Sequence, residues 1–256
     1  MISFKIVIPA RYGATRLPGK PVRLLAGKPM IAHVCARALE TGQPVYVATD
    51  DERVREAVAD LPVEVVMTQS HHTCGTERVA EVASLLNWNR GDVVVNLQGD
   101  EPLMDPGLIE QVARALLESR DAHIATLATP ITQREEMFNP GLVKTVVDHW
   151  GHALYFSRAA IPWHRDSFTD PDAPLPENLP FLRHIGLYAY MAGFLKTYAD
   201  WPVSTLETVE SLEQLRILWQ GELIAVRVVD KAPPAGVDTE ADLQRVEALM
   251  GTAPQH

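Results

Sequence analysis

The sequence predicts an α/β fold: a mostly parallel, Rossmann-like sheet with helices on both faces, plus a smaller antiparallel insertion. Runs rich in Val and Ile alternate with helical segments through the first half of the chain. Such runs are typical of parallel strands that are buried on both faces. Polar loops containing glycine follow two of the runs. Beyond residue 130 the strand-like runs are shorter, and a stretch rich in Pro and Asp interrupts them, which indicates the antiparallel insertion.

The first half of the chain alternates expected strands with expected helices. The strands are expected at residues 4–8, 44–49, 63–67, 92–97 and 123–129, and the helices at 29–42, 50–60, 77–86 and from 105 onward. In the first helix Met30, Val34 and Ala38 repeat every four residues, and Gly42 suits its end. Asp105 followed by a proline is a typical start of a helix.

The second half is less regular. We expect strands at residues 142–148, 153–158, 184–190 and 223–229, an exposed loop at 166–180, and helices at 211–221 and 239–250. Because there is no clean linker and no internal repeat, we expect a single domain, residues 1–256. This half carries four of the five tryptophans, which suit a subunit interface or a core equally well: Trp150, Trp163, Trp201 and Trp219.

Composition limits the classes of function. The net charge of −10 argues against general nucleic-acid binding. No apolar run approaches the roughly 18 residues that a membrane-spanning helix needs, and the amino terminus lacks the pattern of a secretory signal. The two cysteines, Cys35 and Cys74, are far apart and have no metal-ligand spacing. We therefore expect a reduced, cytoplasmic protein that binds neither nucleic acid nor membranes.

A cationic segment opens this acidic chain. Residues 1–39 hold seven of the 23 Lys and Arg residues and none of the 33 Asp and Glu residues. Arg11, Arg16 and Lys20 lie together in the loop "IPARYGATRLPGKP", which also contains two glycines. Guanidinium groups bind phosphate oxygens in a fork and lysine adds a mobile charge, so the loop suits a triphosphate. A chance cluster of solvated cations fits the charge count alone equally well.

The loop matches neither common phosphate-binding motif. Five residues separate Gly13 from Gly19, where the Walker A motif has four, and Pro21 stands in place of its Ser or Thr. The sequence does not contain the dinucleotide motif GxGxxG. A second loop, "QGDEP", follows the strand expected at 92–97. Since ligands bind at the carboxyl ends of parallel strands, we expect the two loops to act together.

Seven segments in order resemble the sugar nucleotidyltransferases, and among them the cytidylyltransferases of the acidic sugar 3-deoxy-manno-octulosonate (Kdo). They are "IPARYGATRLPGKP", "GTERVAEV", "NLQGDEP", "ALYFSRAAIPW", "FLRHIGLYAY", "LEQLR" and "GVDTEADL", and the similarity runs from about Ile6 to Val246. The resemblance implies a fold of the nucleotide-diphospho-sugar transferase type. It implies transfer of CMP from CTP to Kdo, with release of pyrophosphate, for lipopolysaccharide biosynthesis. It also implies Mg²⁺ as cofactor, a homodimer, and a sugar-binding and dimerisation portion at about residues 131–205.

The resemblance also implies roles for individual residues. Arg11, Lys20, Asp100 and Asp238 are implied to be catalytic, and the two aspartates are implied to hold the metal. The implied nucleotide-binding residues are Arg11, Arg16, Lys20, Gly75, Thr76 and Arg78. The implied sugar-binding residues are Gln98, Arg158, His184, Tyr188, Glu213 and Gln214. Their chemistry suits an acidic sugar, because Arg and His donate to a carboxylate and the other side chains bind hydroxyls.

Several of these residues have a structural alternative. Asp238 also starts a helix, in which Thr239 and Asp242 resemble a capping box. Taken alone, His184 suits a structural histidine that is not a ligand. Cys74 departs from the family pattern, which more often has serine there, so a hydroxyl contact at this position is in doubt.

Three other functions stay open at the level of sequence. They are a cytidylyltransferase for another acidic sugar (8-amino-Kdo or sialate), a glycosyltransferase with a similar sheet, and a nucleotide sensor without catalysis. A glycosyltransferase would not need Lys20 near the β- and γ-phosphates. A sensor would not need both aspartates together with all three cations of the first loop.

Overall fold

The computed structural model describes residues 2–13, 17–177 and 179–252. Its strands are β1 (Lys5–Pro9), β2 (Leu24–Leu25), β3 (Lys28–Pro29), β4 (Val45–Thr49), β5 (Glu64–Met67), β6 (Val93–Asn96), β7 (Ile124–Pro130), β8 (Lys144–Val147), β9 (Ala153–Ser157), β10 (Leu182–Met191) and β11 (Ile224–Val228). Its helices are α1 (Met30–Leu39), α2 (Glu52–Glu56), α3 (Gly75–Leu85), α4 (Pro106–Glu118), α5 (Arg134–Phe138), α6 (Ala192–Ala199), α7 (Thr205–Glu210), α8 (Gln214–Trp219) and α9 (Glu240–Thr252), with a 3₁₀ turn at Lys20–Val22.

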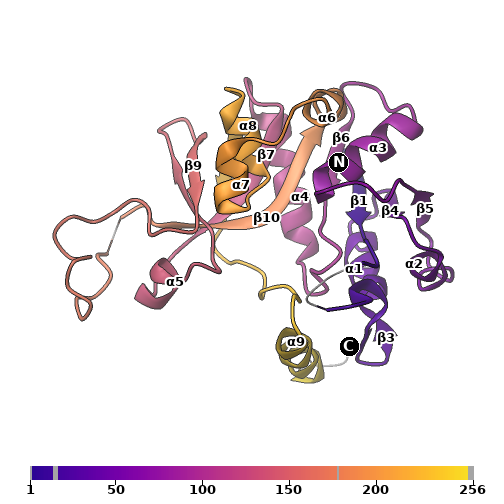
Figure 1. Ribbon diagram of the computed structural model, residues 1–256, viewed down its shortest axis with the longest axis horizontal. Helices are drawn as coiled ribbons and strands as arrows, with labels where there is room; N and C mark the ends of the chain where they lie inside the picture. The colour runs from indigo at the N-terminus through magenta and orange to yellow at the C-terminus, as the bar shows by residue number, and fades with distance from the viewer. Residues whose placement is uncertain (1, 14–16, 178, 253–256) are drawn as a thin grey trace.

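The central sheet has the strand order β11-β7-β10-β6-β1-β4-β5 (Figure 1). β1 pairs in parallel with β4 and β6, β4 with β5, and β11 with β7. β10 runs antiparallel to both of its neighbours in the main sheet, β6 and β7. The expectation of a mostly parallel sheet is therefore confirmed.

Helices cover both faces of this sheet, as the unbroken apolar strands predict. Along β1, Ile6 and Ile8 pack in one cluster with residues of α1 and α4. Val7, between them, packs in a second cluster with residues of α3, α6 and α8. This alternation along one strand places a separate layer of helices on each side.

The region after residue 130 differs from its expected form in one important way. The segment expected as a short strand at 184–190 is the ten-residue strand β10, and it lies in the middle of the main sheet. The antiparallel branch is formed by β8 and β9, which join the sheet through the start of β10. Phe168, in the loop expected to be exposed, is buried and packs against Phe181.

The carboxyl-terminal helix returns to the amino-terminal loop. Leu243 and Val246 of α9 form a small core with Leu17 and Leu25, and Figure 1 shows α9 near the β2–β3 hairpin. Val237, just before this helix, donates its backbone N–H to the carbonyl oxygen of Asp100 at 2.9 Å. This packing brings the carboxyl-terminal helix to the edge of the sheet where the loop after β1 lies. Within the described residues, no helix combines the length and apolar character that crossing a membrane requires.

Candidate active site

A cavity of about 300 Å³ lies beyond the carboxyl ends of β1 and β6, where parallel sheets bind their ligands. It is lined by residues from both loops that the sequence singles out. Those with an implied role are Arg11, Lys20, Gly75, Arg78, Gln98, Asp100 and Asp238. Arg16 lies outside the described residues.

Two glycines allow the walls of the cavity to approach closely. A Cβ atom at Gly99 would lie 2.8 Å from the carbonyl oxygen of Pro9, so the loop after β6 contacts the end of β1 directly. A Cβ atom at Gly75 would lie 3.2 Å from the side-chain oxygen of Gln98. The backbone contact at Gly99 requires glycine. At Gly75 a larger residue would displace the Gln98 side chain, which lies next to the first turn of α3.

Lys20 lies between the two aspartates that the family pattern assigns to metal binding. Its Nζ is 2.6 Å from Oδ2 of Asp100 and 2.8 Å from Oδ1 of Asp238. Burial lowers the pKa of this ammonium, but the charges and hydrogen bonds of the two carboxylates outweigh burial and raise its pKa. Residues 20, 100 and 238, distant in sequence, therefore share one charged centre.

The capping alternative for Asp238 coexists with this contact. Thr239 and Asp242 exchange hydrogen bonds at the start of α9: the Thr239 hydroxyl donates to Asp242 Oδ2 at 2.8 Å, and the Asp242 backbone donates to Thr239 Oγ1 at 3.3 Å. The cap therefore uses Asp242 and leaves the Asp238 carboxylate directed at Lys20. The same local sequence starts the helix and supplies the aspartate.

The donor set at this centre fits Mg²⁺ bound jointly with phosphate. The convergence of two carboxylates on one cation shows that the backbone presents both to the same point. No group of three or more His, Cys, Asp or Glu side chains within the described residues is arranged to hold a metal. Mg²⁺ commonly binds through one or two carboxylates, completed by phosphate oxygens and water. Nearby Glu101 is half-buried, and loss of solvent together with repulsion from Asp100 raises its pKa to about 8.

The two described arginines with an implied role in nucleotide binding occupy different environments. Arg11 is exposed at the mouth of the cavity. Arg78, on α3, is 3% exposed, and its guanidinium donates to Thr68 Oγ1 and, at 3.2 Å, to Asp50 Oδ2. These partners follow β4 and β5, so Arg78 joins the ends of two strands to the cavity wall.

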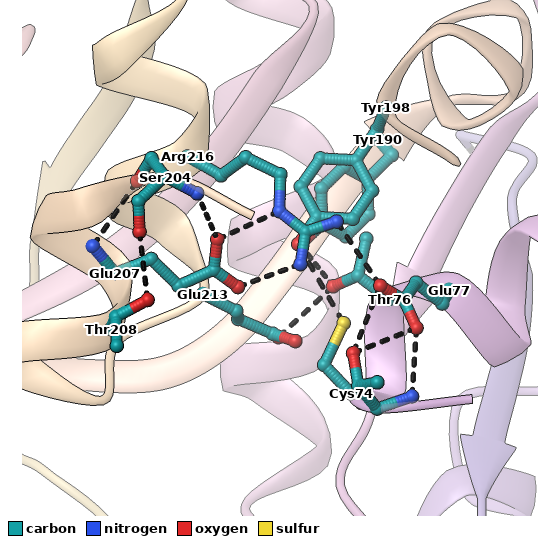
Figure 2. Close-up of polar contacts among 11 residues, drawn as sticks. Cys74, Thr76, Glu77, Tyr190, Tyr198, Ser204, Glu207, Thr208, Glu213 and Arg216 are labelled. Carbon is teal, nitrogen blue, oxygen red and sulfur yellow. Dashed lines mark hydrogen bonds and ion pairs between the residues drawn. The ribbon is translucent and has the colours of Figure 1, made fainter. Parts of the chain in front are cut away.

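A chain of polar contacts connects the cavity to the residues assigned to the sugar. Gln98 donates to Asn96 Oδ1 at 3.4 Å, and Asn96 donates to Thr76 Oγ1 at 3.5 Å. The Thr76 hydroxyl in turn lies 3.0 Å from Glu213 Oε1 and 3.0 Å from the Tyr190 hydroxyl. Figure 2 shows Thr76 between the carboxylate of Glu213 and Tyr190. Thr76 therefore faces the sugar-side residues, and it is absent from the residues that line the cavity.

His184 and Tyr188 lie side by side on β10, with ring centroids 5.3 Å apart. The pairing of β10 with β7 is irregular between Ile185 and Tyr188, which places this pair at a bulge. Burial, aided by the charge of Arg183, lowers the pKa of His184 to about 3, so its imidazole is uncharged at neutral pH. Tyr188 is buried, and its hydroxyl has no hydrogen-bond partner among the described residues.

The other sugar-side residues are held by the backbone or by burial. Arg158 donates from Nε to the Glu210 carbonyl oxygen at 2.8 Å and from Nη1 to the Pro140 carbonyl oxygen at 3.1 Å. Buried Lys144 donates to the carbonyl oxygen of Arg158 at 2.6 Å. Gln214, at the start of α8, is 4% exposed. None of these side chains lines the cavity described above.

Sequence reasoning missed several residues that organise this site. Asn96 ends the all-valine part of β6, and a polar residue ending an apolar strand is a signal that would have found it. Lys144 has no such signal, because its partners are backbone carbonyl oxygens. Arg216 belongs to the quoted segment "LEQLR", but its partners Glu77 and Glu207 lie on other helices.

The chain matches known proteins over nearly its full length. The cytidylyltransferase family model matches residues 5–224. A 3-deoxy-manno-octulosonate cytidylyltransferase of Hahella chejuensis is 56% identical over 251 residues, 98% of either chain. One of Methylococcus capsulatus is also 56% identical, over 254 residues and 98% of either chain. A solved structure of CMP:2-keto-3-deoxy-manno-octonic acid synthetase complexed with CTP has a TM-score of 0.87 and 41% identity, covering 98% of this chain and 99% of that one.

A more distant structure shows only that the fold is shared. A cytidylyltransferase from Leptospira borgpetersenii, 14% identical, has a TM-score of 0.61 over all of this chain and 89% of its own. The resemblance drawn from the seven sequence segments is confirmed by the full-length relatives. The chain belongs to the cytidylyltransferase family and is a nucleotidyltransferase.

Proposed function

We propose that this protein transfers CMP from CTP to Kdo and releases pyrophosphate. The observation that carries the proposal is the cavity itself, where Lys20 joins Asp100 and Asp238 beside a separate group of buried polar residues. Relatives that match the chain end to end are named for this reaction, and a structural neighbour is complexed with CTP. As in related enzymes, the product would serve lipopolysaccharide biosynthesis.

The cationic loop would bind and neutralise the triphosphate. Exposed Arg11 and half-buried Lys20 are 9 positions apart in sequence, and both line the cavity. Positive charge placed where charge develops on the α-phosphate and on leaving pyrophosphate lowers the barrier to phosphoryl transfer. Arg78, anchored to two strand ends, would fix the wall against which the nucleotide binds.

Asp100 and Asp238 would hold Mg²⁺, with Lys20 released to the phosphates. When bound, the ion would supply further neutralisation of the triphosphate. The role of this chain's residues is to present two carboxylates at one point, and the shared contact with Lys20 supports that arrangement. If both carboxylates bound the metal, the ion pairs of Lys20 with Asp100 and Asp238 would be lost, and the Lys20 ammonium would be free to contact the phosphates.

The sugar would be bound by the buried polar residues next to the cavity. The unpartnered hydroxyl of Tyr188 suits a sugar hydroxyl, since a buried polar group without a partner costs free energy until a ligand satisfies it. Glu213 accepts hydrogen bonds, and Gln98 links the sugar side to the cavity. His184 would act as an uncharged hydrogen-bonding group, while Arg158 would supply the positive charge for the sugar carboxylate.

Pyrophosphate release from CTP and Mg²⁺ tests the reaction and the acceptor together. The assay is run without a sugar and with Kdo, 8-amino-Kdo and N-acetylneuraminate. Release that depends on Kdo supports the proposal. Release that depends on one of the other acidic sugars supports transfer of CMP from CTP but shows that this sugar, and not Kdo, is the acceptor. Tight CTP binding without release for any sugar supports a nucleotide sensor and overturns the proposal.

A homodimer and a cytoplasmic location complete the proposal. Trp150, Trp163 and Trp219 are 74%, 55% and 56% exposed, which supports a subunit interface on this half of the chain. Trp201, in contrast, packs against Phe194 and belongs to the core. Sedimentation analysis tests the dimer. Both cysteines are free thiols, as suits a reducing compartment.

A further inference from the structure

Arg216 of α8 lies at the centre of a buried ionic cluster. Its side chain is 1% exposed, and its guanidinium contacts two carboxylates. Nε and Nη2 donate to the two oxygens of Glu207 at 2.8 and 2.7 Å, and Nη1 donates to Glu77 Oε1 at 3.1 Å. The guanidinium also lies over the ring of Tyr198, 4.6 Å from its centroid. Figure 2 shows this fork of contacts, which joins α3, α6, α7 and α8.

Each carboxylate in the cluster also holds backbone. Glu207 forms the capping box of α7, in which the Ser204 hydroxyl accepts from the Glu207 N–H while the Glu207 side chain accepts from the Ser204 N–H. Glu77 accepts hydrogen bonds from the backbone N–H and the hydroxyl of Thr73. Thr73 lines the cavity assigned to the nucleotide. The cluster therefore reaches from α7 to the wall of the nucleotide cavity.

Helices α3 and α8, which the contact between Glu77 and Arg216 joins, are also joined by a second contact beside the cluster. Thr76, next to Glu77 on α3, donates to Glu213, which lies three residues before Arg216 and directly precedes α8. Residues one turn apart lie on the same face of a helix. Two neighbouring contacts, Thr76 to Glu213 and Glu77 to Arg216, thus join the start of α3 to the start of α8. One of the four residues in these contacts, Glu213, is assigned to the sugar.

We propose that Arg216 is a positioning residue that holds Glu213 in register with the nucleotide cavity, so that the acceptor sugar binds correctly beside CTP. This inference rests on the proposed function, since it concerns the acceptor of that reaction. Arg216 acts through Glu77 and Glu207, and the proposal assigns it no contact with either substrate.

The charge balance explains why an arginine is needed here. Two carboxylates, Glu77 and Glu207, pair with one guanidinium, and a third, Glu213, accepts a hydrogen bond from neighbouring Thr76. Burial raises the pKa of Glu213, and the charge of Glu207 adds to that increase. A planar guanidinium satisfies two carboxylates at once, whereas a lysine ammonium is a single point of charge. Removing the arginine leaves buried carboxylates unpaired, and α8 is then free to shift away from α3.

Steady-state kinetics of Arg216→Lys and Arg216→Met test this role, with Arg227→Lys as the matched control. Arg227 lies on β11, is 28% exposed, and forms an ion pair with Glu118 on another element. For Arg216→Lys we expect the KM for Kdo to rise at least about tenfold, because small displacements of binding groups are costly. The KM for CTP should change less, within about threefold, because the cluster reaches the nucleotide cavity only through Thr73, whereas within the described residues no hydrogen bond or ion pair joins Arg11, Lys20 or Asp100 to Arg216 or its two carboxylates. Arg227→Lys should match the wild type in both.

KM is the deciding readout, because it does not depend on the fraction of folded enzyme. A purely structural role would lower the melting temperature and the active fraction while leaving the KM for Kdo unchanged, and that result overturns the proposal. If Arg216→Met fails to fold, Arg216→Lys and Glu207→Gln carry the test, with a raised KM for Kdo expected in each. The same assay of the wild type distinguishes failure of the proposed function from failure of the proposed role of Arg216. Wild-type protein that releases no pyrophosphate with any acidic sugar overturns the proposed function and this role together, whereas normal wild-type turnover with unchanged variant KM overturns this role alone.

Discussion

The proposed nucleotide side and the proposed sugar side of the site are built on different physical principles. On the nucleotide side, charged groups such as Arg11 and Lys20 lie on loops around an open cavity. On the sugar side, Tyr188 and Gln214 are buried and His184 is half-buried, and their environment decides how they ionise and bond. Charge suffices to recognise a triphosphate, because its charge is large and tolerates small displacements. A sugar has mostly neutral groups, so its recognition depends on exact partners in a buried setting.

The largest effect should come from the carboxylate at the charged centre. Asp100→Asn removes one of the two negative charges that face Lys20, and with it a proposed ligand of Mg²⁺. We expect turnover to fall on the order of 10³-fold, comparable to loss of a group that stabilises a transition state. Pyrophosphate release at several Mg²⁺ concentrations measures it. Asp105→Asn is the control, because asparagine caps a helix as well as aspartate. Turnover within tenfold of wild type for Asp100→Asn would contradict the assignment.

Lys20→Met should separate phosphate binding from metal binding. We expect kcat/KM for CTP to fall about 100-fold, because a cation near the phosphates is lost. In the absence of CTP, however, Mn²⁺ should bind more tightly than to wild type, since Lys20 no longer occupies Asp100 and Asp238. Electron paramagnetic resonance of free Mn²⁺ measures this binding. Lys28→Met, an exposed lysine on β3, should change neither quantity. Weaker Mn²⁺ binding to Lys20→Met would sink the idea of a shared centre.

The contrast between the two sides also explains what the sequence could predict. The cations of the first loop and Asp100 follow strands of clear apolar character, so both their chemistry and their position could be predicted. Arg216 could not be placed in this way, because its partner Glu77 lies 139 positions earlier in the chain. The resemblance to a family could name Glu213 without showing the cluster that supports it.

The fold could likewise be predicted where local sequence determines it, and not where it depends on contacts between distant segments. The buried Val-rich strands β1, β4 and β6 were predicted because parallel strands covered on both faces are apolar throughout. The position of β10 was missed, since a strand's sequence does not reveal which strands it pairs with. Helix α6 was missed because it begins directly after β10, with no loop to mark the boundary.

On the sugar side, Tyr188→Phe should change recognition without reducing stability. The hydroxyl has no partner among the described residues, so its removal costs no hydrogen bond in the free protein. We expect the KM for Kdo to rise about tenfold, at the usual value of one hydrogen bond, and the melting temperature to stay level or rise. Tyr190→Phe is the contrast, because its hydroxyl lies 3.0 Å from Thr76 Oγ1. It should lower stability by about 1 kcal/mol. An unchanged KM in Tyr188→Phe would remove Tyr188 from the sugar site.

The lowered pKa of His184 predicts a dependence of stability on pH. The unfolded chain binds a proton at this histidine below pH ~6.5, but the folded protein does so only near its lowered pKa of about 3. The free energy of unfolding should therefore decrease as pH falls through this window, by up to about 1.4 kcal/mol per pH unit. Glu101, whose pKa is raised to about 8, acts in the opposite direction.

Comparison with His184→Gln isolates the histidine, because Glu101 is common to both proteins. Urea unfolding at pH 7 and pH 5 should show a smaller loss of stability for the variant, by about 2 kcal/mol at most over the interval below pH 6.5. Equal losses in the two proteins would mean that His184 titrates normally. In that case its surroundings would not control the ionisation of His184, and this part of the comparison between the two sides would fail.

The smallest effect should come from Cys74, which lies between the two sides. Its Sγ is 3.6 Å from the Tyr198 hydroxyl, and the residue lines the nucleotide cavity. Burial, together with the nearby carboxylate of Glu213, raises the pKa of the thiol, so little thiolate is present at pH 8. We expect Cys74→Ser to keep both KM values within about twofold, because the thiol is a weak partner that a hydroxyl can replace. Iodoacetamide should modify Cys74 much more slowly than free cysteine, and CTP should slow it further. Rapid alkylation that CTP does not slow would show that Cys74 is open to solvent and outside the nucleotide cavity.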